Sequence, residues 1–402
     1  GHESRRLLTS VPGVGESGGN AVLVATDVDV EAQTKRQTRP RLYFVDYIRV
    51  YLTLLVIVHH VLCTYNRNVG WYVWDTNPNQ TAEIFSTLFI VFNQAWFMGA
   101  FFFLAGLFVE SSYAKKGFLQ FLFQRAIRLL IPFCFFYFVL GPLTTWTVLT
   151  IFGWEDITYQ PSAGPLWFAR TLFIFSLIYA CVRYTLKDNR MFAESVDAPP
   201  PRSVISVSWT LCVTLFVGSV SAAMRGVISI ATMYCYYPQY VTAFVLGMAA
   251  TRYGWLHSLE RKHLYAGLIG FGVSLTVILT SCSVVGWDAD FGPFWGMSYT
   301  WPVMLWAFDE QLMGFSVMLI VLYLFSRPLV NRPSASMKWI ARRAFGVYIC
   351  HTICISIPGE AFVFTHAPYW MRGLFLMLFG VPTSWAMAHV MLCIPWVGSH
   401  VL

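Results

Sequence analysis

The sequence predicts an all-α, polytopic membrane protein. Of its 402 residues, 57% are hydrophobic and only 12% are charged, whereas soluble domains carry about 25% charged residues. The apolar residues also gather in runs of about 20, the length that crosses a bilayer core. A net charge of +7 would suit nucleic acid only if it formed one basic face. The basic residues instead lie in short groups between the runs, so we expect the lipid bilayer, and no nucleic acid, as a partner.

Composition divides the chain into two parts. Residues 1–40 are rich in Gly, Ser and Thr and contain no long apolar run. They predict a disordered, positively charged cytoplasmic tail. Residues 41–402 predict a single transmembrane domain.

The apolar runs predict about ten transmembrane helices packed in one bundle. In chain order they cover residues 45–65, 85–109, 129–152, 165–184, 204–224, 236–252, 264–286, 303–326, 339–358 and 373–396. The sixth run is the shortest. An even number of spans predicts that both termini lie on the same side of the membrane.

The distribution of positive charge predicts the orientation. With the N-terminal tail in the cytoplasm, 22 of the 27 lysines and arginines fall on the cytoplasmic side, as the positive-inside rule requires. Both termini are then cytoplasmic. The single N-x-Ser/Thr sequon, at Asn79, falls in the first outer loop, where a glycan could be added. We expect a multi-pass protein of the plasma membrane or an endomembrane.

The first span, "VDYIRVYLTLLVIVHH" at residues 45–60, carries ionisable groups at both ends. Such groups are costly in hydrocarbon and usually have a function or a partner. Asp46 precedes Arg49 by three residues, a spacing at which helical side chains meet. Arg49 and His60 are eleven residues apart, which places them within roughly 20° of one helix face and about 16 Å apart.

His59 lies about 80° from that face, so His60 is the histidine aligned with Arg49. Because neutral imidazole has an unperturbed pKa that suits a base near pH 7, His60 is the candidate catalytic base. A stripe of polar groups that only bond neighbouring helices is the structural alternative.

Three further polar residues reach a similar depth in later spans. Arg170 follows Trp167 near the outer end of the fourth span, Glu310 lies in the eighth, and His351 is near the middle of the ninth. We predict that these residues contact substrate. The structural alternatives are an ion pair between Arg170 and Glu310 and a helix-locking hydrogen bond from His351.

The cytoplasmic side predicts a basic entrance. Arg49 lies there inside the first span, and four further arginines lie near it in the predicted topology: Arg125, Arg128, Arg342 and Arg343. The positive-inside rule accounts for most of these residues, but not for Arg49. A basic entrance, an apolar passage and a distant histidine suit an elongated donor with an anionic head and a thin tail.

Five motifs in the expected order resemble the integral-membrane acyltransferase-3 family, which includes bacterial O-antigen O-acetyltransferases and nose-resistant-to-fluoxetine-like animal proteins. The first joins Asp46, Arg49 and His60, and the second is "RAIRLLIP", with Arg125 and Arg128. The others are "FFFLAGLF" at 101–108, "GPLWF" at 164–168 and "FGVYICH" at 345–351. The resemblance covers nearly all of residues 42–402. Ala105 stands where the family usually has Ser, and Pro165 where it often has His.

The resemblance implies transfer of an acyl group, often acetyl, from cytoplasmic acyl-CoA to a hydroxyl of a carbohydrate or lipid-linked acceptor at the outer face. It implies that His60 acts as general base or transient acyl carrier, with Arg49, oriented by Asp46, guiding the donor. Arg125 and Arg128 would bind the phosphates of CoA. Acyl-CoA is then a substrate, and no cofactor is expected to be permanently bound. The nine cysteines form no metal-binding pattern, so we expect no metal.

Two other functions fit the composition. A proton-coupled transporter could use His60, Arg170 and Glu310 along its pathway, although the sequence contains no clear inverted repeat. A receptor or scaffold could use the fold without chemistry, although the Arg49–His60 pattern argues against it.

Overall fold

The computed structural model describes residues 42–66, 69, 71–73, 79–186, 205–228, 234–286, 294, 297–365 and 367–401. The tail predicted for residues 1–40 lies outside these ranges. The described residues form helices and no strand, which confirms the all-α class.

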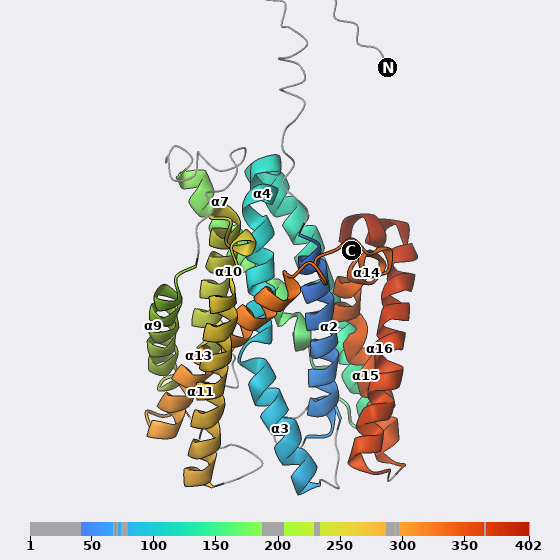
Figure 1. Ribbon diagram of the computed structural model, residues 1–402. Coiled ribbons are helices and arrows are strands. Elements are labelled where there is room, and N and C mark those ends of the chain that lie inside the picture. Colours follow the sequence, from blue (N-terminus) through green and yellow to red (C-terminus); the bar gives the residue numbers. More distant parts are fainter. Residues whose placement is uncertain are drawn as a thin grey trace, which may run out of the picture. The chain divides into compact units, whose positions relative to one another are not determined.

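Figure 1 shows the helices of the described residues, coloured in chain order from blue to red. The α-helices are α2 (Tyr43–Thr64), α3 (Gln80–Gln94), α4 (Phe97–Arg125), α5 (Ile131–Phe135), α6 (Gly141–Phe152), α7 (Trp167–Thr185), α9 (Val207–Arg225), α10 (Tyr237–Arg252), α11 (Arg261–Val285), α13 (Trp301–Phe325), α14 (Ala335–Ala341), α15 (Ala344–Val363) and α16 (Tyr369–Cys393). Short π-helical turns are η1 (Ala126–Leu130), η2 (Phe136–Leu140) and η7 (Val397–Val401). Short 3₁₀ turns are η3 (Gly164–Leu166), η5 (Tyr234–Tyr236) and η6 (Trp255–His257).

Eight helical segments of the described chain are long and apolar enough to cross a membrane, so the protein is a multi-pass membrane protein. One of them, Gln80–Phe152, has 73 residues, too many for a single crossing. It contains the second and third predicted spans. The sixth predicted span coincides with α10, whose 16 residues are fewer than the roughly 20 that a straight crossing needs.

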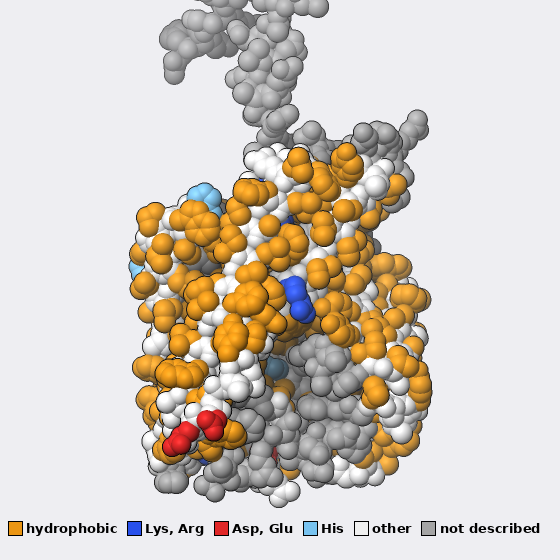
Figure 2. Space-filling model, turned by 180° about the vertical axis from the view of Figure 1, so that it is seen from behind, with side chains coloured by type: hydrophobic (Ala, Val, Ile, Leu, Met, Phe, Trp, Pro, Cys, Tyr) orange, Lys and Arg blue, Asp and Glu red, His pale blue; other side chains and the backbone are white. Residues whose placement is uncertain are grey.

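The outer surface is apolar, as lipid contact requires. Hydrophobic side chains cover most of the described surface in Figure 2, and only a few charged groups interrupt them. Large exposed side chains include Ile269 on α11 and Leu378 on α16. This exposure is consistent with helices that face hydrocarbon rather than water.

Helix α2 lies inside the bundle, where it contacts α15, α16, α3 and α4. In Figure 1 it stands between α3 and the α15–α16 pair. Because its neighbours cover it on several sides, 12 of its 22 residues are buried. The buried residues include the polar Thr53, His59 and Thr64, which therefore face protein rather than lipid.

The second predicted motif lies where the chain bends. Gly117 interrupts α4 with a φ of 71°, a left-handed conformation that glycine adopts without steric cost. Arg125 ends α4, and Arg128 lies in the π turn η1 that follows. Single π turns often occur at functional sites. The kink and the turn place both arginines beside the first turns of α2, as the cavity described below demonstrates.

Candidate active site

Asp46 and Arg49 form the contact that their spacing predicts. Arg49 Nη1 lies 3.2 Å from Asp46 Oδ1, and both side chains are partly exposed. One turn later, the hydroxyl of Thr53 donates to the carbonyl of Arg49 over 2.8 Å. The carboxylate therefore restrains the guanidinium at the start of α2.

A cavity of about 540 Å³ opens beside Arg49. Five cationic side chains line it: Arg49, Lys116, Arg125, Arg128 and Arg342. Sequence analysis anticipated four of them, whereas Lys116 was not singled out. Arg343, also anticipated, does not line this cavity. Its Nη1 donates to the carbonyl of Trp339 over 2.6 Å, and its Nη2 lies 3.0 Å from His389 Nδ1.

The rest of the cavity wall is mostly apolar. Most of its large apolar side chains come from three helices, among them Phe101, Leu104 and Phe108 of α4, Phe168 and Leu172 of α7, and Phe345 and Tyr348 of α15. Ala105 also lines it. Ala105, which stands where the family usually has Ser, thus faces the cavity that holds the arginines. A group of cations above an apolar passage suits an amphiphilic anion.

Tyr348 lies between this cavity and the predicted histidines. Its ring lines the cavity and stacks on His351 with centroids 6.0 Å apart. Its hydroxyl donates to the carbonyl of Pro165, which ties α15 to the turn η3. Neither Tyr348 nor this bond was anticipated, although Tyr348 lies within the motif that ends at His351.

His60 and His351 lie together, as a shared site requires. Their rings stack with centroids 5.2 Å apart. On its other side His60 stacks on Trp71, with centroids 3.7 Å apart. His60 Nδ1 is buried, and within the described part of the chain it neither accepts nor donates a hydrogen bond. The ring of His60 thus has a nitrogen that no neighbouring group uses.

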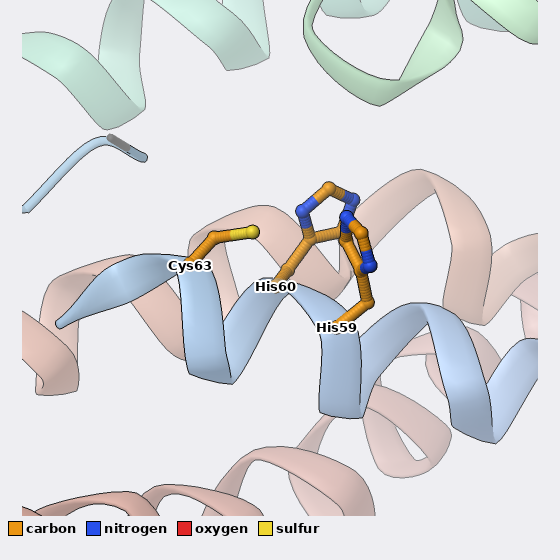
Figure 3. Close-up of side chains that lie close together, drawn as sticks. All are labelled: His59, His60 and Cys63. Carbon is orange, nitrogen blue, oxygen red and sulfur yellow. The ribbon is translucent and has the colours of Figure 1, made fainter. Parts of the chain in front are cut away.

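The tautomer of His351 follows from its contacts. Its Nδ1 lies 2.9 Å from the carbonyl oxygen of Tyr348, which can only accept, so Nδ1 carries the proton. Nε2 is therefore the basic nitrogen, and it is buried with no hydrogen-bond partner among the described residues. Figure 3 shows His60 beside His59 on α2. Nδ1 of His59 lies 3.3 Å from Nδ2 of Asn93.

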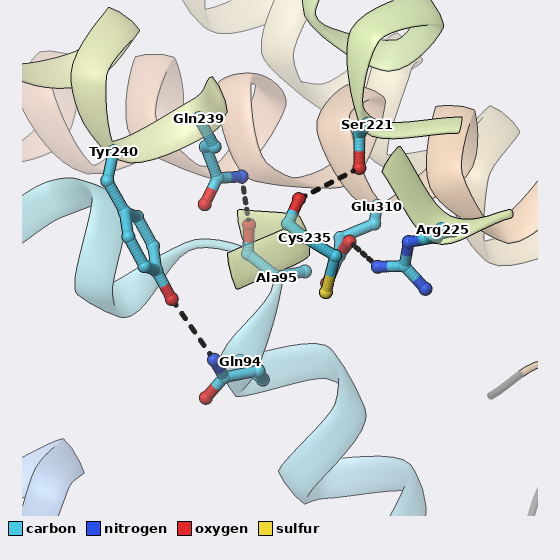
Figure 4. Close-up of polar contacts among 8 residues, drawn as sticks. All are labelled: Gln94, Ala95, Ser221, Arg225, Cys235, Gln239, Tyr240 and Glu310. Atoms are coloured by element: carbon cyan, nitrogen blue, oxygen red, sulfur yellow. Dashed lines mark hydrogen bonds and ion pairs between the residues drawn. The ribbon is translucent and has the colours of Figure 1, made fainter. Parts of the chain in front are cut away.

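Three other predicted site residues lie apart from His60. Glu310 pairs with Arg225 of α9, and both side chains are buried; Figure 4 shows this pair near Ser221 and Cys235. The predicted alternative partner, Arg170, instead lies over the ring of Phe133 at 5.8 Å. Trp167 stacks on Tyr240 at 5.6 Å and does not line the cavity.

The separation of these residues has a consequence for the transporter hypothesis. That hypothesis placed His60, Arg170 and Glu310 along one pathway. In the described structure each of the three contacts a different set of residues: Glu310 pairs with Arg225, Arg170 lies over the ring of Phe133, and His60 stacks on Trp71 and His351.

Comparison with known proteins gives one match. A family model described as an acyltransferase domain, that of the acyltransferase-3 family, matches residues 42–389. No curated protein and no solved structure matches.

Proposed function

The chain belongs to the acyltransferase-3 family, and on this premise we propose that it transfers an acyl group from acyl-CoA to a hydroxyl group. The acyl group is acetyl in the simplest case, and acyl-CoA reaches the protein from the cytoplasm. The acceptor hydroxyl belongs to a carbohydrate or a lipid-linked molecule on the outer or lumenal side. The observation that carries this proposal is the cavity beside Arg49, in which five cations meet a mostly apolar passage. The cavity reaches Tyr348, in the helical turn that precedes His351.

CoA has a matching division of charge. Its phosphates would contact Arg125 and Arg128, with Lys116 and Arg342 adding positive charge, because guanidinium groups bind phosphate oxygens through paired hydrogen bonds. The uncharged pantetheine arm would occupy the passage lined by Phe101, Leu104 and Phe168. Arg49, restrained by Asp46 at 3.2 Å, would guide the arm along α2.

His60 would then act on the acceptor. A ring nitrogen removes the hydroxyl proton while the oxygen attacks the thioester carbon, and the carbon–sulfur bond breaks. The proton passes from His60 to the leaving thiolate, so the products are an ester and CoA with a free thiol. His351, stacked on His60, would keep the ring in place. For the thioester to reach His60, either the Tyr348 side chain must move aside or the donor must bend around its ring.

The test uses purified protein in detergent with radiolabelled acetyl-CoA and membranes as the acceptor source. Wild type, His60→Ala and His59→Ala are compared. General-base catalysis contributes roughly 10²–10⁴-fold, so His60→Ala should lose about a hundredfold or more in turnover. His59→Ala should keep most of the activity, because its ring does not lie on the Arg49 face. Equal turnover in all three proteins would remove His60 from the mechanism. Proton-driven flux in liposomes without acetyl-CoA binding would favour transport.

A further inference from the structure

We propose that His59, His60 and Cys63 form a binding site for a soft divalent cation such as Zn²⁺. One ligand atom from each residue lies within 4.8 Å of the others. All three side chains come from the last turns of α2, and the two imidazoles lie close together beside the cysteine (Figure 3), with ring centroids 5.3 Å apart and planes nearly perpendicular. Because one helix carries the three groups, their spacing is set before any ion binds.

The ligand types select the metal. Imidazole nitrogen and thiolate sulfur bind Zn²⁺ strongly, whereas Mg²⁺ and Ca²⁺ prefer oxygen. Two histidines and one cysteine leave the fourth tetrahedral position for water or another small ligand, an arrangement known in zinc proteins. Cys63 forms no disulfide and would release its thiol proton on binding.

The surroundings also suit metal ligands. His59 and Cys63 are 6% and 2% exposed, and the buried Nδ1 of His60 has no hydrogen-bond partner in the described structure. Asn93 of α3 contacts His59 Nδ1 at 3.3 Å. Asn93 Oδ1 is buried with no hydrogen-bond partner in the described structure, and with the amide turned by 180° it would accept from Nδ1–H. That contact would leave Nε2 of His59 as a ligand, in the way that outer carbonyls orient metal-bound histidines.

Occupancy would oppose catalysis. A bound ion takes the lone pair that His60 needs as a base, so Zn²⁺ would inhibit reversibly. This second part rests on the function proposed above, whereas metal binding itself does not. The spacing of the cysteines predicted no metal, and this proposal departs from that expectation because two of its three ligands are histidines on the same helix as Cys63.

The test titrates the purified full chain with Co²⁺, a spectroscopic substitute for Zn²⁺, and then displaces it with Zn²⁺. Cys63→Ser removes the thiolate with little change of size. His59→Phe removes the imidazole but keeps an aromatic ring at this position. That ring can still stack on Phe97, as His59 does with ring centroids 5.0 Å apart. Cys235→Ser is the control, since Cys235 is buried on η5 beside Arg225 and Glu310.

Wild type and Cys235→Ser should bind one Co²⁺ with a sulfur-to-cobalt charge-transfer band. Cys63→Ser should lose the band, and both site variants should bind Zn²⁺ at least about tenfold more weakly. No Co²⁺ binding by wild type, or an unchanged band in Cys63→Ser, would overturn the proposal. In the transferase assay, Cys63→Ser should need at least about ten times more Zn²⁺ for half inhibition. Co²⁺ binding at Cys63 in a protein whose metal-free form has no transferase activity would refute the proposed function and leave the metal site standing.

Discussion

The imidazole of His60 is stacked on that of His351 with ring centroids 5.2 Å apart, although 291 residues separate them in the sequence. The rings of Phe345, Tyr348, His351, His60 and Trp71 follow one another in a column with centroid distances of 6.3, 6.0, 5.2 and 3.7 Å. The column begins at the cavity wall and ends at the loop that follows α2. It therefore joins the proposed donor site to the far end of that helix.

Neutralising the cavity arginines should weaken donor binding more than chemistry. Arg125→Ala and Arg128→Ala should each raise the KM for acetyl-CoA roughly tenfold or more, because a hydrogen bond to a charged group contributes about 1.5–3 kcal/mol. The value of kcat should change less, since these residues lie far from His60. Steady-state kinetics at several salt concentrations measures both constants, and the mutants should show a weaker salt dependence of KM.

Arg343→Ala provides the matched control for these variants. It removes an arginine from the neighbouring turn, but one that contacts Trp339 and His389 rather than the cavity. Its KM for acetyl-CoA should stay within about twofold of wild type, because Arg343 is used in contacts with Trp339 and His389 and does not line the cavity. A rise as large as that of Arg125→Ala would attribute the effect to overall charge and contradict the phosphate contacts.

A larger side chain at position 105 should obstruct the passage. Ala105 lines the cavity next to Leu104 and Phe108, so Ala105→Trp would fill part of the 540 Å³ that the pantetheine arm requires. We expect acetyl-CoA binding, measured by calorimetry in detergent, to weaken at least about tenfold, the cost of roughly 1.4 kcal/mol. Ala105→Ser adds one oxygen and should bind like wild type. Unchanged binding by Ala105→Trp would exclude this passage as the donor path.

The sequence predicted those features that depend on a single helix. The Asp46–Arg49 contact follows from helical spacing alone, and long apolar runs suffice to predict the helical class. The choice of His60 over His59 rests on the same helical angles and stays a prediction. The partner of Glu310 depends instead on how α13 packs against α9, which no local pattern encodes. Arg225 lies one residue beyond the span predicted for residues 204–224, yet it is the last residue of α9 and is 2% exposed.

Tyr348 shows the same limit. Its position in the motif "FGVYICH" was visible, but its bond to the carbonyl of Pro165 joins α15 to a turn 183 residues away. Lys116 was counted among the cytoplasmic charges, but it lies on the same face of α4 as Phe108 and Ser112, and only the packing of the bundle turns that face toward the cavity. Long-range packing therefore determines which charges at the membrane surface belong to the site.

Breaking the buried Arg225–Glu310 pair should destabilise the fold without affecting the chemistry. Glu310→Gln leaves the guanidinium of Arg225 without its charge partner in a site that is 2% and 0% exposed. The loss of one member of a buried pair costs about 3–5 kcal/mol. We expect a clearly lower thermal midpoint in detergent, with near wild-type turnover per folded molecule at low temperature.

The double variant Arg225→Met, Glu310→Met separates charge from packing. Apolar residues of similar volume often replace a buried ion pair without loss of stability, so the midpoint should recover relative to Glu310→Gln. If Glu310→Gln instead kept its stability but lost turnover, Glu310 would contact substrate, as the sequence first suggested.

Packing of α4 against α10 should depend on two glycines. A Cβ at Gly106 would collide with the carbonyl of Phe244, and one at Gly247 with the carbonyl of Phe103. Because both obstacles are backbone atoms, Gly106→Val should separate the helices and cost about 1–3 kcal/mol or more. α4 carries Phe101 and Leu104 on the cavity wall, so acetyl-CoA binding should weaken together with the thermal midpoint.

Gly272→Ala is the control, since a Cβ there meets nothing within 4 Å. On α11 it should keep or slightly raise the midpoint, because alanine favours helix by up to about 1 kcal/mol. Equal midpoints for the two variants would show that the α4–α10 contact tolerates separation and does not support the cavity.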